Sequence, residues 1–240
     1  MAKYQGATFL TDDGSASVNV DFPNMPGAPD VAVAIHTASP QNGMVGAEPD
    51  SALARVIVSQ PAVIGQEYRI VGRYNHSKVT RRYFGVVHGF AVGTGVIGHG
   101  LGEVPDMYYA GYADGLNTPS FAITGVDDTN FEVTNYGAAP FNCFVGCWLL
   151  HSHDIPRYTM PAASVTLPCG GGQVVVPHGL GIAPDLVLPS PEQAAIDPAP
   201  AGQAAVIDVD DTNITLENTM GAGNDLNVTL FAQLTNSIQA

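Results

Sequence analysis

The sequence predicts an all-β protein, a tandem array of three small β-sandwich modules of a jelly-roll-like kind. Residues 99–106, which read His-Gly-Leu-Gly-Glu-Val-Pro-Asp, return as His-Gly-Leu-Gly-Ile-Ala-Pro-Asp at residues 178–185. Val-Asp-Asp-Thr-Asn at residues 126–130 also returns, at residues 209–213, so that the two pairs of echoes lie 79 and 83 residues apart. Such self-similarity is the signature of a repeat architecture. The 27 glycines and 18 prolines suit short strands joined by many turns, and helical periodicity is hard to find.

The repeats divide the chain into a divergent N-terminal module, a middle module and an acidic C-terminal module. We place these modules at residues 1–77, 78–155 and 156–240. The third module is acidic beyond Arg157, near its start, because no lysine or arginine follows that residue.

The first module is recognised by a looser match. Residues 20–30 align without gaps on residues 96–106, which places Met25 on Leu101 and Pro23 on His99. The His-Gly pair is lost, but Pro23 and the asparagine after it are also turn formers. We therefore predict a third copy of the module at the N-terminus.

Each repeated octet predicts a tight turn between two strands. The two glycines provide the backbone freedom that the turn needs, and the leucine between them is expected to be buried. Proline has no N–H to donate and suits the start of the following strand. The histidine is expected to hydrogen-bond to the backbone of the turn. The residues predicted to hold these turns are His99, Gly100, Leu101, Gly102, Pro105, His178, Gly179, Leu180, Gly181 and Pro184.

The Val-Asp-Asp-Thr-Asn echoes predict hairpin loops of four residues. In the middle module the echo joins a strand at residues 121–126 to a strand at residues 131–135. Aspartate and asparagine in such a loop can hydrogen-bond to nearby backbone groups. Calcium is an alternative ligand for Asp127, Asp128, Asp210 and Asp211. The loops lack a spaced ladder of acidic residues, so turn capping explains them better.

The closing strands of the last two modules predict different surroundings. In the third module, apolar residues alternate with polar residues from Leu226 to Thr235, which predicts one buried face and one solvent-exposed face. In the middle module both faces are apolar. Cys143, Val145, Cys147 and Leu149 share one face, and Phe144, Trp148 and Leu150 share the other. A small module cannot cover both faces alone, so Phe144, Trp148 and Leu150 are our candidates for an interface.

Composition restricts the classes of partner. The chain has 22 acidic and 8 basic residues, and its net charge of −14 argues against a surface that binds nucleic acid or an anionic membrane. The N-terminus lacks the apolar core of a signal peptide, and no apolar run is long enough to span a bilayer. Cys143 and Cys147 lie about 13 Å apart if both are on one strand, too far for a disulfide. Folding in a reducing cytosol is the simpler account.

The two octets, within small β-rich modules that end in a hydrophobic strand, resemble modules of structural proteins of tailed bacteriophages. These include capsid decoration (cement) proteins, head fibres and tail fibres. The resemblance covers the second and third modules and, loosely, the first. It implies a non-enzymatic virion protein, typically a homotrimer. We expect this protein to be made in the host cytoplasm and to bind the major capsid protein or other virion proteins on the head surface.

Three other kinds of site compete with that interpretation. His151 and His153 lie on one face of an extended segment and could bind a divalent metal, although a strand end entering a linker explains them more simply. Tyr108, Tyr109 and Tyr112 are the aromatic cluster that could bind a glycan in a tail-fibre or receptor-binding protein. For an enzyme, neither Gly-x-Ser-x-Gly nor a recurring serine or cysteine accompanies His99 and His178. We therefore expect no catalytic residue, no cofactor and no bound metal.

Overall fold

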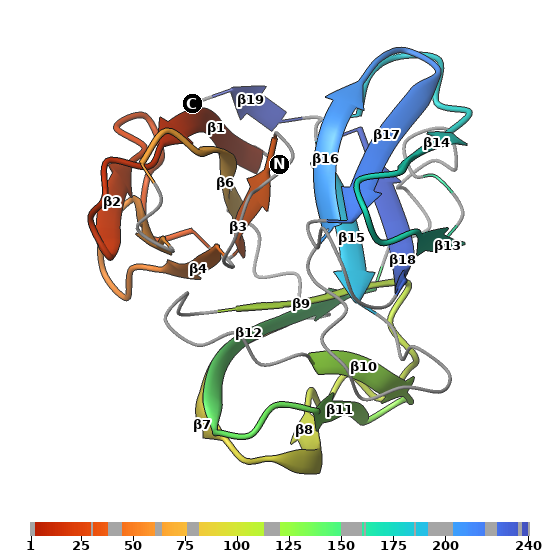
Figure 1. Cartoon of the computed structure of the whole chain (residues 1–240). Coiled ribbons are helices and arrows are strands. Elements are labelled where there is room, and N and C mark those ends of the chain that lie inside the picture. The colour runs from red at the N-terminus through yellow and green to blue at the C-terminus, as the bar shows by residue number, and fades with distance from the viewer. Residues whose placement is uncertain are drawn as a thin grey trace.

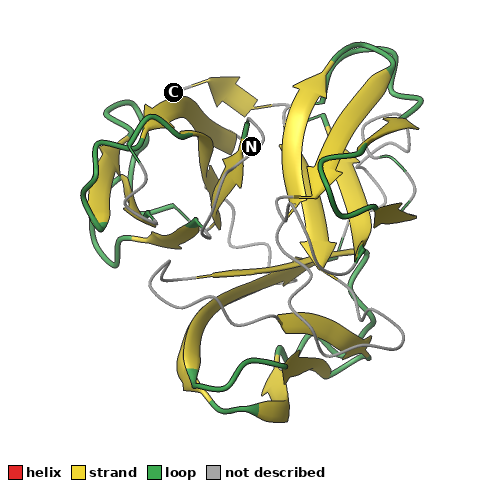
Figure 2. Cartoon of the chain, in the orientation of Figure 1, coloured by secondary structure: helices red, strands yellow, loops and turns green. Residues whose placement is uncertain are grey.

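The structure, a computed structural model, describes residues 3–29, 31–37, 45–60, 64–75, 82–112, 121–149, 160, 162–184, 186–191, 204–218, 225–234 and 237–239. This part of the chain contains nineteen strands and no helix, as Figure 2 shows. The prediction of an all-β fold is confirmed. The predicted module boundaries, at residues 77/78 and 155/156, lie outside the described residues.

In the described part of the chain each module contains six strands, and the C-terminus adds one. The first module holds β1 (Lys3–Thr11), β2 (Ser17–Asp21), β3 (Val31–His36), β4 (Gly46–Pro49), β5 (Arg55–Ser59) and β6 (Glu67–Asn75). The second holds β7 (Arg82–Phe90), β8 (Gly93–Gly98), β9 (Met107–Tyr112), β10 (Phe121–Val126), β11 (Asn130–Asn135) and β12 (Phe141–Trp148). The third holds β13 (Ala163–Leu167), β14 (Gln173–Pro177), β15 (Leu186–Pro191), β16 (Ala204–Val209), β17 (Asn213–Asn218) and β18 (Leu226–Gln233). The last strand is β19 (Ser237–Gln239).

One strand order occurs three times. Each module has an inner sheet, in the order β1-β6-β3, β7-β12-β9 or β13-β18-β15, and an outer sheet, in the order β2-β5-β4, β8-β11-β10 or β14-β17-β16. All pairings within a module are antiparallel. The first strand pairs with the sixth and the second with the fifth, which is the nested pairing of a small jelly roll. Residues 3–75 therefore carry the same strand order as the two modules that share the octet.

The strand register corrects the gapless alignment of the first module by one residue. Asp21 pairs with Arg55, as Gly98 pairs with Asn130. Phe22 N–H then donates to the Ala54 carbonyl, as His99 N–H donates to the Thr129 carbonyl. Phe22, which is buried, thus occupies the place of His99, and the turn that follows is one residue longer than the octet turns.

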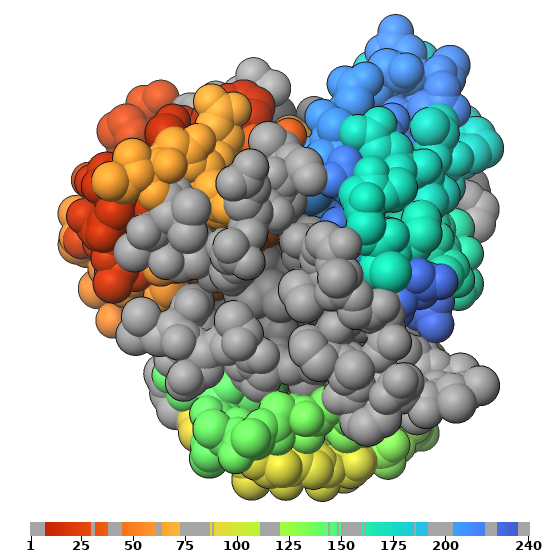
Figure 3. All heavy atoms as spheres, viewed as in Figure 1, coloured from red at the N-terminus to blue at the C-terminus, as the bar shows by residue number. Residues whose placement is uncertain are grey.

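The three modules close into a ring. Strand β4 contacts β9, β10 contacts β15, and β16 contacts β3. These contacts are equivalent, because each joins the fourth strand of one module to the third strand of the next. A head-to-tail contact that returns to its start after three modules is a closed ring with cyclic pseudo-symmetry. Figure 1 shows the modules around a common centre, and Figure 3 shows them as three lobes.

Two parallel strand pairings also join the modules. Gly46 on β4 pairs with Tyr112 on β9, which makes one six-stranded sheet from the outer sheet of the first module and the inner sheet of the second. Strand β19 pairs with β1, with Lys3 opposite Ser237. The C-terminal strand therefore lies on the inner sheet of the first module.

The centre of the ring is an apolar core that all three modules share. Val33, Tyr109 and Leu188 are the third residues of β3, β9 and β15, and each is buried in this core. The core of the third module is continuous with it, whereas the first two modules each have a further core between their own sheets. The ring is therefore one packed unit at its centre.

The closing strand of the third module is buried on both faces, so the predicted solvent-exposed face is wrong. Thr229 and Gln233, two of its polar residues, are only 5% and 3% exposed. Phe231 lies between them on the same face, and the ring of Tyr108 on β9 packs edge-on against it, with centroids 4.9 Å apart. The face predicted to meet water is therefore a contact between the second and third modules.

The closing strand of the middle module has the predicted buried face. Cys143, Val145 and Cys147 are fully buried between the two sheets of the module, and both cysteines are free thiols. Of the interface candidates, Phe144 and Trp148 are described through their backbone alone, and Leu150 lies outside the described residues. Their part in an interface stays a prediction.

Candidate functional site

The repeated octets form turns built around their histidines. The glycines adopt left-handed conformations: φ is +61° at Gly100 and +74° at Gly102, and the glycines of the second octet have almost the same values. A Cβ atom would be strained in this region. Pro105 and Pro184 are buried just before β9 and β15.

The histidines use both ring nitrogens on the backbone. His99 Nδ1 accepts a hydrogen bond from Leu101 N–H at 3.3 Å, and His99 Nε2 lies 3.1 Å from the Asp127 carbonyl oxygen. In the second octet the same two distances are 3.1 Å and 3.0 Å, to Leu180 and Asp210. Because Nδ1 accepts, the proton lies on Nε2, which donates to the carbonyl. Each imidazole therefore ties its turn to the adjacent hairpin loop, and neither nitrogen is left for a metal or a substrate.

Burial at these turns differs from the prediction. His99 and His178 are only 6% and 3% exposed, whereas Leu101 and Leu180 are partly buried at the edge of their cores. The prediction that the leucines are buried is therefore met only in part. The turn points its histidine inward, because the imidazole must reach the hairpin loop. His99 also packs against Phe131, with ring centroids 5.1 Å apart.

Replacing His99 by leucine should lower the free energy of unfolding by about 1–3 kcal/mol, because Leu101 N–H and the Asp127 carbonyl each lose a partner. His99→Gln should cost clearly less, since an amide can both donate and accept. Urea denaturation of the two variants measures the difference. Equal losses for Gln and Leu would show that the ring contributes through packing alone.

The hairpin loops are capped by their first aspartate. Asp127 Oδ1 accepts hydrogen bonds from Thr129 N–H at 2.7 Å, from Asn130 N–H at 2.6 Å and from the Thr129 hydroxyl at 2.9 Å. Asp210 repeats these bonds with Thr212 and Asn213. Asn130 and Asn213 already belong to strands β11 and β17, so each loop has three residues rather than the predicted four. The described residues contain no cluster of three or more metal-ligating side chains, and Asp127 and Asp210 serve as caps.

The first module has the same cap at Asp50, which the sequence comparison missed. Asp50 Oδ1 accepts from Ala52 N–H at 2.9 Å and from Leu53 N–H at 3.0 Å. Its loop, residues 50–54, has five residues and shares only the aspartate with the other two. The available signal was an aspartate directly after a short strand.

These caps make the protein sensitive to acid. The hydroxyl and N–H of Thr212 and the N–H of Asn213 lower the pKa of Asp210 from 3.8 to about 2. A lowered pKa stabilises the fold above the ordinary value, and this stabilisation is lost as pH falls toward the folded value. Asp210→Asn should therefore lower the melting temperature at pH 7, and the difference from wild type should vanish near pH 2. Asp128→Asn is the control, because Asp128 takes no part in the cap bonds. A deficit for Asp210→Asn that is constant with pH would contradict this account.

A buried amide recurs in all three modules and was also missed. Gln60, Asn135 and Asn218 occupy the same position in their modules, at or just after the end of the fifth strand, and are almost fully buried. Gln60 Nε2 donates to the Ser15 carbonyl at 2.9 Å, and Asn135 Nδ2 donates to the Ala139 carbonyl at 3.0 Å. Asn218 Nδ2 donates to the Leu167 carbonyl at 3.5 Å. The repeated polar groups of the module thus hold its loops.

The aromatic cluster proposed for a glycan is not a surface platform. Tyr109 is 7% exposed in the central core, and its burial raises its pKa. The ring of Tyr108 packs between Phe131 and Phe231. The side chain of Tyr112 lies outside the described part of the chain, as do the metal candidates His151 and His153.

Comparison with protein-family models, with curated proteins and with solved structures finds no match. Among the described residues no helix is long and apolar enough to cross a membrane.

Proposed function

We propose that this chain is a non-enzymatic structural protein of a tailed-bacteriophage virion, most simply a capsid decoration (cement) protein that stabilises the head by binding its shell. The observation that carries the proposal is the use of the recurring polar groups. The histidines, the loop aspartates and the buried amides all hydrogen-bond to the backbone of their own modules. Because these repeated side chains bond to the backbone of their own modules, they favour a structural protein over an enzyme.

The resemblance of the octets to phage structural modules supports the same proposal. The protein would be made in the host cytoplasm and would bind the major capsid protein, or another virion protein, on the head surface. The sequence predicts a homotrimer. One chain already forms a closed ring of three modules. We therefore expect a single chain, rather than three, to be the unit that binds.

A tail-fibre or receptor-binding protein is the second candidate, because the same kind of module occurs there. Its glycan-binding form is weakened by the burial of Tyr109 and the packing of Tyr108.

Electron microscopy of purified virions that carry an affinity-labelled copy of the protein tests the proposal. We expect label over the whole head surface, with heads that lack the protein breaking at lower temperature. Label at the tail tip alone would favour the second candidate, and virions without label would refute both.

A further inference from the structure

The outer sheets expose aliphatic side chains at equivalent positions. Val96 on β8 is 64% exposed and Val175 on β14 is 58% exposed. Both occupy the outward-facing position in the middle of the second strand of their modules, with inward-facing neighbours on either side. A single exposed valine needs no explanation. The same exposure in two modules of different sequence points to a shared surface.

A carboxylate lies in the same cross-strand row as each valine. In the second module, Val96 pairs with Glu132, and Glu132 pairs with Gly125. In the third module, Val175 pairs with Thr215, and Thr215 pairs with Asp208. The carboxylate is on the middle strand in one module and on the far strand in the other. Each row therefore contains one aliphatic and one carboxylate side chain, which are direct neighbours in the second module and are separated by Thr215 in the third.

The first module has a row that also contains one aliphatic and one carboxylate side chain, and both are partly exposed. Asn19 pairs with Ile57, and Ile57 pairs with Glu48. Here the aliphatic side chain is on the middle strand and the carboxylate is on the far strand. The ring thus carries one aliphatic–carboxylate row on the outer sheet of each module.

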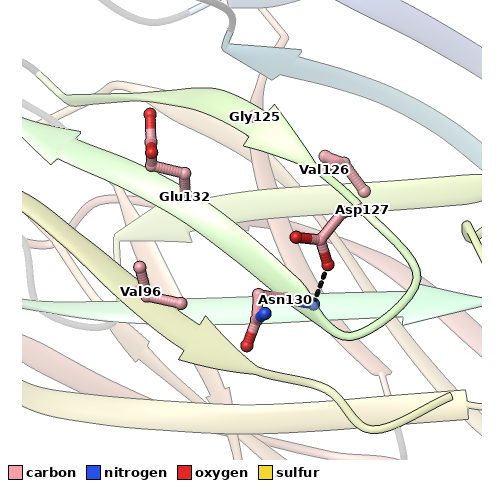
Figure 4. Close-up of a pocket in the computed structure, with 6 residues that line it drawn as sticks. All are labelled: Val96, Gly125, Val126, Asp127, Asn130 and Glu132. Atoms are coloured by element: carbon pink, nitrogen blue, oxygen red, sulfur yellow. Dashed lines mark hydrogen bonds between the residues drawn. The ribbon is translucent and has the colours of Figure 1, made fainter. Parts of the chain in front are cut away.

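In the second module the row lies in an open hollow, shown in Figure 4. Its lining consists of Val96, Gly125, Val126, Asp127, Asn130 and Glu132. Gly125 adds no side chain to the hollow, and a Cβ atom there would make an ordinary contact with the Cβ of Glu132, at 3.4 Å. Two valines and two carboxylates therefore surround a space that one extended side chain can enter. The Thr129 and Asn130 N–H groups lower the pKa of Asp127, so its carboxylate stays charged at neutral pH.

We propose that these three rows are docking sites for lysine and arginine side chains on a basic segment of a partner protein. The alkyl stem would pack on the Val or Ile, and the cationic end would meet the carboxylate of the same row. Long basic side chains have this divided character, with an apolar stem and a charged tip. Charge complementarity favours a basic partner, since the chain carries 22 acidic and 8 basic residues. The inference rests on the proposed function, because the partner is taken to be the virion shell. It adds that the bound surface of the shell carries basic side chains.

The first test uses a five-residue peptide with two arginines, and the same peptide with citrulline in their place. Nuclear magnetic resonance of the methyl groups should show shifts at Val96, Ile57 and Val175 with the arginine peptide, and none with citrulline. Val96→Thr, which changes no charge, and Glu132→Gln should each reduce the shifts around the second-module row at least threefold. Glu67→Gln removes the same charge from an exposed position on β6 and should leave them unchanged.

The inference is overturned if Glu67→Gln weakens binding as much as Glu132→Gln does, because the attraction would then be that of net charge alone. It is equally overturned if Val96→Thr binds the peptide as wild type does.

A second test uses virion heads that lack the protein. The variant with Val96, Val175 and Ile57 all replaced by threonine should bind them at least tenfold more weakly than wild type. Equal binding of the variant would refute the rows while leaving the proposed function intact. If wild type itself fails to bind heads, the proposed function fails, and the peptide experiment still decides whether the rows recognise basic side chains.

Discussion

Replacing Phe131 by alanine should lower the free energy of unfolding by about 3–5 kcal/mol, the range for removing a large aromatic side chain from a packed core. Phe131 is fully buried on β11, and its ring lies against His99 and Tyr108, at centroid distances of 5.1 Å and 6.4 Å. The cavity would therefore remove support from the octet turn. It would also loosen Tyr108, whose ring packs on Phe231 of the third module.

Urea denaturation followed by tryptophan fluorescence and by circular dichroism measures the loss. The two signals should change together, because the shared core couples the modules. Val96→Ala, on the neighbouring strand β8, is the matched control and should change stability by less than about 0.5 kcal/mol, since Val96 is 64% exposed. A loss below 1 kcal/mol for Phe131→Ala, or separate transitions for the two signals, would contradict a packed and coupled core.

The sequence was sufficient for the fold class and the repeat. The octets marked two turns with left-handed glycines, and residues 126–130 marked a hairpin with its aspartate cap. These features are local. They depend on residues within a few positions of one another, so a short pattern contains all the information that they need.

The local sequence pattern could not predict which side chain of the octet turn is buried. A leucine between two glycines is the natural candidate for a core position, yet His99 is the more buried residue. Its burial depends on a carbonyl oxygen 28 residues later, which only the folded hairpin brings within reach. Phe22, in the same place in the first module, shows that an apolar ring also fills this position when the hairpin loop is longer.

The alternation of polar and apolar residues could not predict the contacts between modules. The alternation along β18 correctly separated two faces, but Thr229 and Gln233 were assigned to water because they are polar. Their face meets the second module through Phe231 and Tyr108. Likewise, nothing in the octets indicates that β16 contacts β3 and returns the array to its start. The strands that meet between modules are equivalent in position, but their residues differ from one copy to the next, so the self-similarity of the sequence does not reveal the interface.

Because one chain closes the ring, we expect the protein to be a monomer. Sedimentation equilibrium at micromolar concentration should give the mass of one chain, 24.9 kDa. The resemblance to phage structural proteins implied a homotrimer, and the closing strand of the middle module, which is apolar on both faces, predicted an interface. Within one chain, Met107 and Tyr109, on the strand paired with it, already lie in the core shared with the other modules.

The symmetry of the contacts gives the same answer. A head-to-tail interface assembles copies until the ring closes, and here it closes after three modules. The third-strand and fourth-strand surfaces of every module are then occupied, and β19 covers β1 at the junction of the two chain ends. Among the strands that the structure describes, no head-to-tail contact of this kind remains for a second chain. A mass of three chains, stable on dilution, would show that association uses a different surface. A single-chain mass would mean that one polypeptide supplies by itself the threefold arrangement that was expected of a homotrimer.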